Sequence, residues 1–394
     1  MQTPTPQRIL IAGGGLGGLT LALELLAAGF EVEVYERAQA LSEVGAGITL
    51  WENALKVMRH VGLSDALAAA GAPLGDAMFA TADGQKVSDV GKSTYAPYDP
   101  TFEILGIHRA DLQAILMDAL PDGVVHLGRR VTGIMNHSDR AGLRFEDGGE
   151  VWGDLLVGAD GIRSQVRAGL LADGPPRYAG YTCWRAVVDD WPERGPFLGE
   201  VWGQGTRIGL MGIGKGRLYW YATANTPQGR PKLEPRACHT ALRERFASHA
   251  WGIPDLIERT SPDAILRNDI VDRPPKRPWS RGRVVLIGDA CHPTTPNMGM
   301  GAALAIEDGA VLTNALVRFG ADYQAAFQAF EDARYPRTSR IQNLSWRLGQ
   351  VGQLEGAWLC AARNLVFSNI PTRLTVKQTL EVGSYDATQI MTPL

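Results

Sequence analysis

The sequence predicts an α/β fold built from two interleaved domains and followed by C-terminal helices. Three separated motifs predict the first domain, because each joins a short apolar strand to a turn rich in glycine or aspartate. They lie at residues 8–18, 154–167 and 281–308. Between the second and third motifs the chain alternates as β-strands do, which indicates a second domain inserted into the first.

The first motif is a strand, a glycine-rich turn and the start of a helix. Residues 8–12 (RILIA) form the expected strand, the turn is GGGLGG, and residues 19–28 carry helical apolar spacing. In a Rossmann fingerprint Gly13 makes the tight turn, Gly15 lets a pyrophosphate approach, and Gly18 packs the helix against the strand. We therefore expect a Rossmann-like, dinucleotide-binding domain.

A second strand, residues 31–36 (EVEVYE), follows the first helix and ends on Glu36. An acidic side chain about 20 residues after the glycines hydrogen-bonds the adenosine ribose. Its charge repels a 2′-phosphate, so the sequence favours the unphosphorylated adenosine of FAD or NAD. Leu16 in the turn and Arg37 beside Glu36 are further candidate contacts of the cofactor.

The middle motif runs from a strand at 154–159 (DLLVGA) into Asp160-Gly161 and a basic stretch that begins a helix. Asp-Gly is a common turn sequence. Taken alone, this pattern favours a charged surface turn, so its interpretation depends on the other two motifs.

The third motif is the most informative part of the chain. A strand at 284–287 ends at Gly288-Asp289, and a proline-rich loop leads to a helix that begins near residues 297–301. Asp289 can accept hydrogen bonds from sugar-like hydroxyls, and the free N–H groups of a helix start favour negative charge. The candidate contacts in this motif are Asp289, Pro296, Gly299, Met300, Gly301 and Ala302.

In this order, the three motifs resemble those of the single-component (group A) FAD-dependent aromatic monooxygenases, the para-hydroxybenzoate hydroxylase-like flavoproteins. The resemblance extends from residue 8 to about residue 340. It implies a glutathione reductase-type FAD-binding domain in which Asp160 and Asp289 contact the cofactor. Two more segments match: VGAGI at 44–48, which places Gly47 beside the flavin, and IHR at 107–109, whose helix-opening Arg109 contacts the cofactor.

Within this family, two segments resemble the branch of salicylate hydroxylase, zeaxanthin epoxidase and urate hydroxylase: YAGYTCW at 178–184 and GRLYW at 216–220. Two positions depart from the family pattern. Many relatives have Gln where Met300 stands, and Ala302-Ala303 replaces an asparagine found in phenol hydroxylase-type relatives. The departures leave the FAD prediction intact and leave the substrate open.

The resemblance also implies a reaction. NADPH or NADH reduces the bound FAD, oxygen adds at flavin C4a, and the hydroperoxide hydroxylates or epoxidises an aromatic or conjugated small molecule. Because one dinucleotide fingerprint is present, we expect NAD(P)H to bind transiently as a co-substrate. Pro296 would stiffen its loop and keep water from the peroxide. A reductase or oxidase of the same fold, without oxygen insertion, is the alternative.

The inserted domain is expected to cover the flavin and form the substrate pocket. Strands at 207–211 and 217–223 form a plausible hairpin around a Gly-Lys-Gly turn. Arg207 could hold an anionic substrate, and Tyr219 could hydrogen-bond its oxygen or relay its proton. Both residues are equally compatible with a plain sheet surface. An aromatic pocket lining and a sheet core are likewise both compatible with Trp184, Trp202 and Trp220.

These patterns predict three parts of the chain. The C-terminal part either caps the pocket or forms a partner surface. The expected boundaries are 1–74, 102–177 and 279–330 for the FAD-binding domain, 75–101 and 178–278 for the β-sheet substrate domain, and 331–394 for the C-terminal helices.

Composition agrees with a large, compact enzyme. The chain has 394 residues, of which 45% are hydrophobic, and a formal net charge of −3, which gives no reason to expect nucleic-acid binding. The four cysteines and seven histidines lack disulfide or metal-ligand spacing, so we expect no metal and a reducing, cytoplasmic location. His292 is expected to brace its loop. No export signal or transmembrane segment is expected, and the protein would be a monomer or homodimer.

Two other flavoprotein classes fit the sequence poorly. Flavin-dependent halogenases carry a Trp-x-Trp-x-Ile-Pro segment, which this chain lacks. A disulfide reductase needs a redox cysteine pair soon after the first helix, whereas the first cysteine here is Cys183. A flavin-bearing binding protein without catalysis is a third class, and nothing in the pocket sequence indicates a blocked site.

Overall fold

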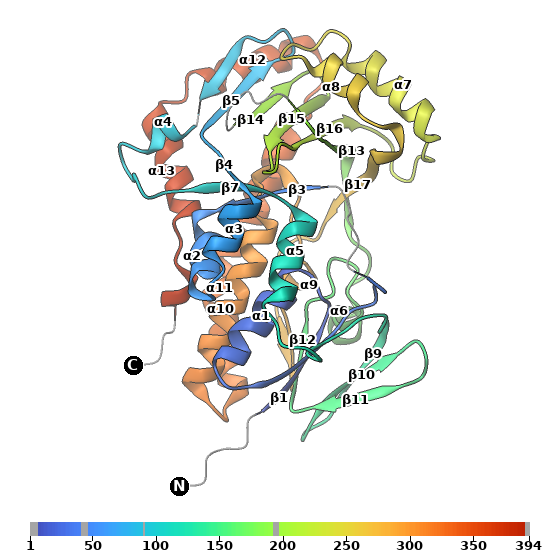
Figure 1. Cartoon of the computed structure of the whole chain (residues 1–394), viewed down its shortest axis with the longest axis vertical. Coiled ribbons are helices and arrows are strands. Elements are labelled where there is room, and N and C mark those ends of the chain that lie inside the picture. The colour runs from blue at the N-terminus through green and yellow to red at the C-terminus, as the bar shows by residue number, and fades with distance from the viewer. Residues whose placement is uncertain (1–6, 41–45, 90, 192–196, 391–394) are drawn as a thin grey trace.

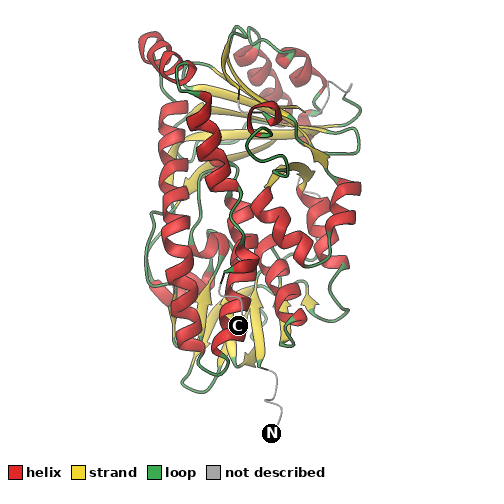
Figure 2. Ribbon diagram, turned by 90° about the vertical axis from the view of Figure 1, so that its left-hand side faces the viewer, coloured by secondary structure: helices red, strands yellow, loops and turns green. Residues whose placement is uncertain are grey.

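The computed structural model describes residues 7–40, 46–89, 91–191 and 197–390. Its elements form two stacked parts, a lower one around a parallel sheet and an upper one around a larger, mostly antiparallel sheet (Figure 1). Long helices run between the two sheets (Figure 2). Val44 and Gly45, which belong to the expected flavin-side segment, lie outside the described residues.

The lower sheet has six strands in the order β18-β19-β12-β1-β2-β8. Neighbouring strands are parallel except for β18 and β19. The strands predicted in all three motifs are confirmed. Their apolar runs suit strands that are buried on both faces of a parallel sheet. The strands are β1 (Arg8–Ala12), β2 (Glu31–Tyr35), β8 (Val125–His126), β12 (Leu155–Gly158), β18 (Ser280–Arg281) and β19 (Val284–Leu286).

Helices cover this sheet. The first begins at Leu16, three residues before the predicted start, because Gly15 is its N-cap and Gly17 and Gly18 are already helical. Glycine also lets it approach its neighbour, since a Cβ on Gly17 would lie 3.0 Å from the Cβ of Ala305. The main helices here are α1 (Leu16–Ala27), α5 (Arg109–Asp118), α6 (Gln165–Leu171), α10 (Gly301–Phe319) and α11 (Tyr323–Gly352).

Two small sheets flank the lower part. One carries the strand that reaches the upper sheet, β3, paired antiparallel with β7. The other packs beside α6. Their elements are β3 (Gly47–Trp51), β4 (Ala72–Pro73) and β7 (Ile104–His108), with α2 (Glu52–His60) and α3 (Ser64–Ala70), and β9 (Val131–Asn136), β10 (Ala141–Phe145) and β11 (Glu150–Gly153).

The upper sheet has seven strands in the order β17-β13-β16-β15-β14-β5-β6. Residues 76–89 supply its last two strands, so the chain enters this sheet twice. The strands are β5 (Asp76–Thr81), β6 (Lys86–Asp89), β13 (Arg177–Val188), β14 (Phe197–Trp202), β15 (Thr206–Gly212), β16 (Leu218–Asn225) and β17 (Leu266–Asp272). The short helix α4 (Lys92–Tyr95) follows β6.

The predicted hairpin is β15 and β16, which pair antiparallel. Its turn holds Gly214, Lys215 and Gly216 at positive φ, a backbone conformation that glycine adopts without strain.

Helices α7 (Pro235–Phe246) and α8 (Ile253–Arg259) cover the outer face of this sheet. Trp220 is fully buried there, in a cluster with Phe246, and Trp184 packs against the same cluster. Trp202 instead contacts Phe79 and Phe367. Of the two interpretations of the tryptophans, the structure therefore supports the sheet core for Trp184 and Trp220.

The C-terminal part consists of the long helix α11 and of α12 (Ala357–Ser368), α13 (Thr372–Gly383) and the 3₁₀ turn η3 (Ala387–Gln389). No helix among the described residues is long and apolar enough to cross a bilayer.

Candidate active site

The three motif turns lie side by side at the carboxyl ends of neighbouring parallel strands, the usual position of a ligand in such sheets. Gly13 follows β1, Asp160 follows β12, and Gly288 follows β19. Backbone hydrogen bonds join the turns directly: Ala159 N–H donates to Ala12 O at 2.8 Å, and Ile287 N–H donates to Gly158 O at 3.0 Å.

The glycines of the first turn serve two different purposes. Gly13 has φ +110°, and a Cβ there would lie 2.4 Å from Ala159 O. A Cβ on Gly18 would lie 2.1 Å from Gly13 O, so the protein's own packing requires both glycines. Gly15 has an ordinary φ of −76°, and no described atom lies within 4 Å of its Cβ position. This open cradle is what a closely approaching pyrophosphate needs.

A cavity of about 570 Å³ opens in front of these turns. Its walls include six of the predicted cofactor residues: Gly13, Gly15, Glu36, Arg37, Arg109 and Asp160. Leu16 and Gly18 lie just behind it, in the first turn of α1. The cavity therefore gathers residues from the first and middle motifs and from the start of α5.

Glu36 is held in place by backbone donors. Its carboxylate accepts hydrogen bonds from Gly14 N–H at 2.8 Å and from Ala38 N–H at 2.9 Å. Gln113 also fixes the turn, because its Nε2 donates to Gly14 O at 2.8 Å. We did not predict Gln113, although a position four residues after Arg109 on the same helix is a signal for it.

Asp160 lines the cavity and has one carboxylate oxygen without a hydrogen-bond partner among the described residues. Its Oδ2 caps α6 by accepting from Gln165 N–H at 2.7 Å and Val166 N–H at 3.2 Å. Its Oδ1 is buried and has no hydrogen-bond partner in the described part of the chain. Burial raises the pKa of this carboxyl, which hydrogen bonds from Ser164, Val166 and Gln165 oppose. A buried unpaired oxygen is costly, and a ligand hydroxyl would satisfy it.

Asp289 lies on α9 (Gly288–Cys291), a single helical turn where the sequence indicated only loop. The turn forms because Gly288, with φ +56°, lets the chain leave β19 sharply. Desolvation by the surrounding protein raises the pKa of the Asp289 carboxyl, and the electrostatic influence of His292 and Arg109 opposes this rise. Because β19 pairs with β12, the turn that carries Asp289 lies beside the turn that carries Asp160.

A buried carboxylate supports this motif from behind. Asp308 Oδ2 accepts from Gly288 N–H at 2.8 Å and lies 2.6 Å from His292 Nε2, and Asp308 Oδ1 accepts from Arg334 at 2.7 Å. Burial alone would raise the pKa of Asp308, but His292 and Arg334 lower it overall. The prediction that His292 braces its loop is confirmed.

The loop before α10 supplies backbone donors. Helix α10 begins at Gly301, and its N-cap Met300 is buried and gives no side-chain cap. The first N–H groups of a helix have no acceptor within it, so those of Gly301 and Ala302 favour a negatively polarised group. Gly299 has φ +60°, and Pro296 opens the 3₁₀ turn η2 (Pro296–Met298) with an exposed ring.

The inner face of the upper sheet meets this region through β3. A Cβ on Gly47 would lie 2.6 Å from the Tyr219 ring, so the sheet and β3 touch there. Arg207, Tyr219 and Tyr221 share this face, in keeping with the β15–β16 register. Arg207 is 4% exposed and Tyr219 is 9% exposed, so neither lies on a plain sheet surface. Burial raises the pKa of Tyr219, which keeps its hydroxyl protonated.

All three guanidinium nitrogens of Arg207 donate hydrogen bonds to side chains of the protein. Its Nη1 donates to Glu200 at 3.1 Å, its Nη2 to Asn297 Oδ1 at 2.6 Å, and its Nε to Gln353 at 2.8 Å. Asn297 Oδ1 also accepts from Tyr181 at 3.0 Å. Because Glu200 balances its charge, Arg207 links the sheet, the flavin-side loop and the end of α11 rather than offering a free cation.

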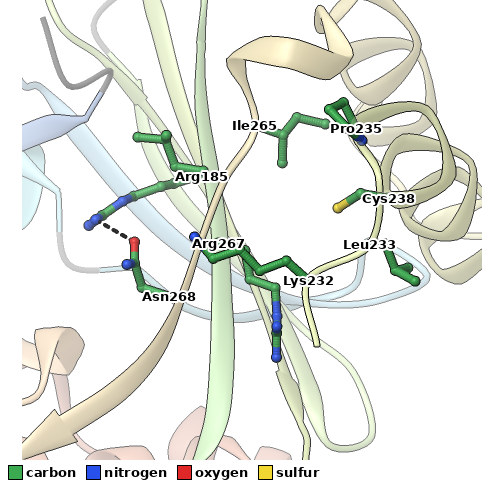
Figure 3. A pocket seen from close by; sticks show the side chains of 9 residues that line it. Arg185, Lys232, Leu233, Pro235, Cys238, Ile265, Arg267 and Asn268 are labelled. Atoms are coloured by element: carbon green, nitrogen blue, oxygen red, sulfur yellow. Dashed lines mark hydrogen bonds between the residues drawn. The ribbon is translucent and has the colours of Figure 1, made fainter. Parts of the chain in front are cut away.

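Arg185 also lies on this face, and it forms no ion pair with any residue that the structure describes. It pairs across β13–β16 with Tyr221, two positions from the pair of Val187 with Tyr219, so it shares their face of the sheet. Its Nη2 donates to Asn268 at 2.8 Å, and its buried Nε has no hydrogen-bond partner among the residues that the structure describes. Arg185 also lines a second cavity, of about 350 Å³, where it points toward Asn268 and away from Cys238 on α7 (Figure 3).

Within the described ranges, no group of three or more His, Cys, Asp or Glu side chains could hold a metal ion. The four cysteines are buried and unpaired with one another. We did not predict Glu200, Tyr181 or Gln353, and nothing in the local sequence around Gln353 marks it.

Comparison with known proteins places this geometry in a family. The model of the FAD binding domain matches residues 7–343. The chain is 43% identical to aurachin C monooxygenase/isomerase of Stigmatella aurantiaca, over 90% of this chain and 92% of that protein. It is 34% identical to 2-heptyl-3-hydroxy-4(1H)-quinolone synthase of Pseudomonas aeruginosa, over 95% and 98% of the two chains.

A solved structure is similar over nearly the whole length. HpxO of Klebsiella pneumoniae, in complex with FAD and uric acid, superposes with a TM-score of 0.88 at 28% identity, over 95% of this chain and 96% of that one.

Proposed function

The chain belongs to the FAD-binding-domain family and is a single-component, flavin-dependent aromatic monooxygenase, and on that basis we propose that it oxygenates a nitrogen heterocycle that carries a hydroxyl or carbonyl group on its ring. The quinolone and the uric acid named for two similar proteins are both heterocycles of this kind. The observation that carries the proposal is the inner face of the upper sheet, which holds the buried phenol of Tyr219 and the guanidinium of Arg185, whose charge no described acidic residue balances.

The residues of the lower part fit FAD. Glu36 would hold the adenosine ribose, and the open cradle at Gly15 would take the pyrophosphate. The unpaired Oδ1 of Asp160 and the carboxylate of Asp289 would accept hydrogen bonds from ligand hydroxyls. The start of α10 would face the electron-rich edge of the flavin. Bound FAD supplies the redox chemistry, taking electrons from NAD(P)H and activating oxygen.

Two side chains of the upper sheet would act on the substrate. Tyr219 is protonated at neutral pH, and burial raises its pKa further, so it would donate a hydrogen bond to the hydroxyl or carbonyl oxygen of the substrate. Arg185 lies near enough to Tyr219 to oppose that rise, and its charge would stabilise negative charge on the same oxygen. Both residues would therefore favour the deprotonated form of the substrate oxygen. Deprotonation makes the ring more electron-rich, and an electron-rich ring accepts an electrophilic oxygen atom more readily.

The proposed activity is tested by a substrate screen on the purified protein. We expect a yellow protein whose NAD(P)H oxidation is accelerated by 4-quinolones or hydroxypyridines, with a product that gains one atom from isotopically labelled oxygen gas. Accelerated oxidation without label in any product would support a reductase or oxidase instead. A colourless protein that cannot take up FAD would overturn the proposal altogether.

Removing the charge of Arg185 should change the pH dependence of the reaction. In Arg185→Gln we expect kcat to reach half its maximum about one pH unit higher than in the native enzyme, since one unit corresponds to ~1.4 kcal/mol of lost charge stabilisation. The lower kcat at neutral pH should recover in part in Arg185→Lys.

Arg267→Gln is the matched control, because Arg267 lies on the neighbouring strand but shares the outer face with Trp184. The same shift in both variants would mean that the effect is one of net charge, and no shift in Arg185→Gln would exclude its contact with the substrate oxygen.

A further inference from the structure

Helix α12 has its polar and apolar faces reversed relative to an ordinary surface helix. Cys360 and Arg363 point inward, where Arg363 donates to Gly203 O and Gly352 O and lies over the Trp202 ring. The outward face is apolar: Trp358 is 90% exposed, Leu365 65% and Val366 62%. Such a face is unusual on a water-soluble surface and marks an interaction site.

The apolar side chains form one continuous stripe. Positions 358, 361, 362, 365 and 366 follow the spacing that places residues on one side of a helix. The exposed Ile370 and Leu374 extend the apolar surface into the start of α13. We name this surface the α12 stripe, and its large exposed side chains are Trp358, Leu359, Leu365, Val366, Ile370 and Leu374.

Within the segment that carries the stripe the charges are of one sign, and the nearest acidic residues in sequence, Glu355 and Glu381, stand just outside it. From residue 356 to residue 380 the chain has three basic residues and no acidic one. Arg363 is buried, whereas Arg373 and Lys377 are exposed on α13. An apolar helix face with an accessible tryptophan and flanking basic side chains matches the chemistry of an anionic lipid surface, into which the helix lies flat.

We propose that the α12 stripe binds the surface of an anionic lipid bilayer, with α12 lying in the interface. Trp358, Leu365 and Val366 enter the boundary between headgroups and acyl chains, and Arg373 and Lys377 meet anionic headgroups. The helix lies on the membrane and does not cross it, since it has 12 residues. In Figure 1 α12 lies at the upper end of the molecule, away from both termini, and the side chains of its outward face are exposed. This proposal does not depend on the identity of the substrate.

Co-sedimentation with vesicles tests the proposal. The FAD-loaded protein should sediment with vesicles of equal parts phosphatidylcholine and phosphatidylglycerol, and much less with phosphatidylcholine alone. The triple variant Trp358→Ser/Leu365→Ser/Val366→Ser should bind more than about tenfold more weakly. The variant Arg373→Gln/Lys377→Gln should lose about fivefold per charge on the anionic vesicles only.

Val317→Ser/Phe319→Ser is the matched control, because these exposed apolar residues lie on the last turn of α10, outside the stripe. It should bind vesicles as the native protein does. Flavin absorbance and thermal unfolding show whether each variant is folded, and Trp358→Ser alone serves if the triple variant is not.

Native protein that stays in the supernatant with anionic vesicles would overturn the proposal. A dimer seen by analytical ultracentrifugation and lost in the triple variant, without vesicle binding, would assign the stripe to a second copy of the chain instead. Equal binding by the native protein and the triple variant would also overturn it.

Discussion

Arg207→Met is expected to lower kcat about a hundredfold while the protein keeps its FAD. The substitution leaves the largely buried carboxylate of Glu200 without its ion-pair partner. It also removes the 2.6 Å contact of Arg207 with Asn297, one of the four hydrogen bonds that hold this amide. Loss of one partner of a buried ion pair costs about 3–5 kcal/mol of unfolding free energy. Loss of a positioning contact beside the reacting atoms costs about two orders of magnitude in rate. Steady-state kinetics, flavin absorbance and thermal unfolding measure the three quantities.

The double variant Arg207→Met/Glu200→Gln separates the two effects. Removing the charge of Glu200 as well should restore most of the unfolding free energy, because no buried charge is then left unbalanced. It should not restore kcat, since Asn297 still lacks its contact with Arg207. Recovery of both quantities together would show that Arg207 acts on stability alone and has no positioning role.

Gly15→Val is expected to weaken FAD binding by about two orders of magnitude or more without unfolding the protein. The Cβ position of Gly15 is open and its backbone is extended, so the side chain strains nothing in the fold. It would instead fill the cradle that a pyrophosphate needs. Titration of the apoprotein with FAD, followed by flavin fluorescence, measures the affinity.

Gly133→Val in β9 is the control, because Gly133 also has an open Cβ position. Its apoprotein should unfold at the same temperature as that of Gly15→Val, and its FAD affinity should be native. If Gly15→Val binds FAD as well as the control does, the cofactor does not approach this turn.

The FAD-binding side of the fold could be predicted because its signals are local. A strand, a turn that only glycine can make, and a helix follow one another within residues 8–27. Each later motif likewise has its strand, turn and helix close together in the sequence. Parallel pairing then brings the three turns together, since the carboxyl ends of neighbouring strands share one edge.

The substrate side could be predicted only in part. The sequence predicted that Arg207 and Tyr219 lie on neighbouring strands of the inserted sheet, but period-two alternation does not say which face of a sheet looks toward the cofactor. The partners of Arg207 were beyond sequence reasoning, because Gln353 lies 146 positions away and Asn297 lies 90 positions away. Contacts at such separations leave no periodic trace in a single sequence.

The amide of Asn297 restricts how this protein can be recombined with others. Its Oδ1 accepts from Arg207 and Tyr181, and its Nδ2 donates to Thr295 and to Ser345 O on α11. A chimaera that imports a relative's upper sheet but retains its own α11 would mismatch these contacts. In a functional chimaera, residues 177–272 and 296–353 would therefore have to come from the same parent protein.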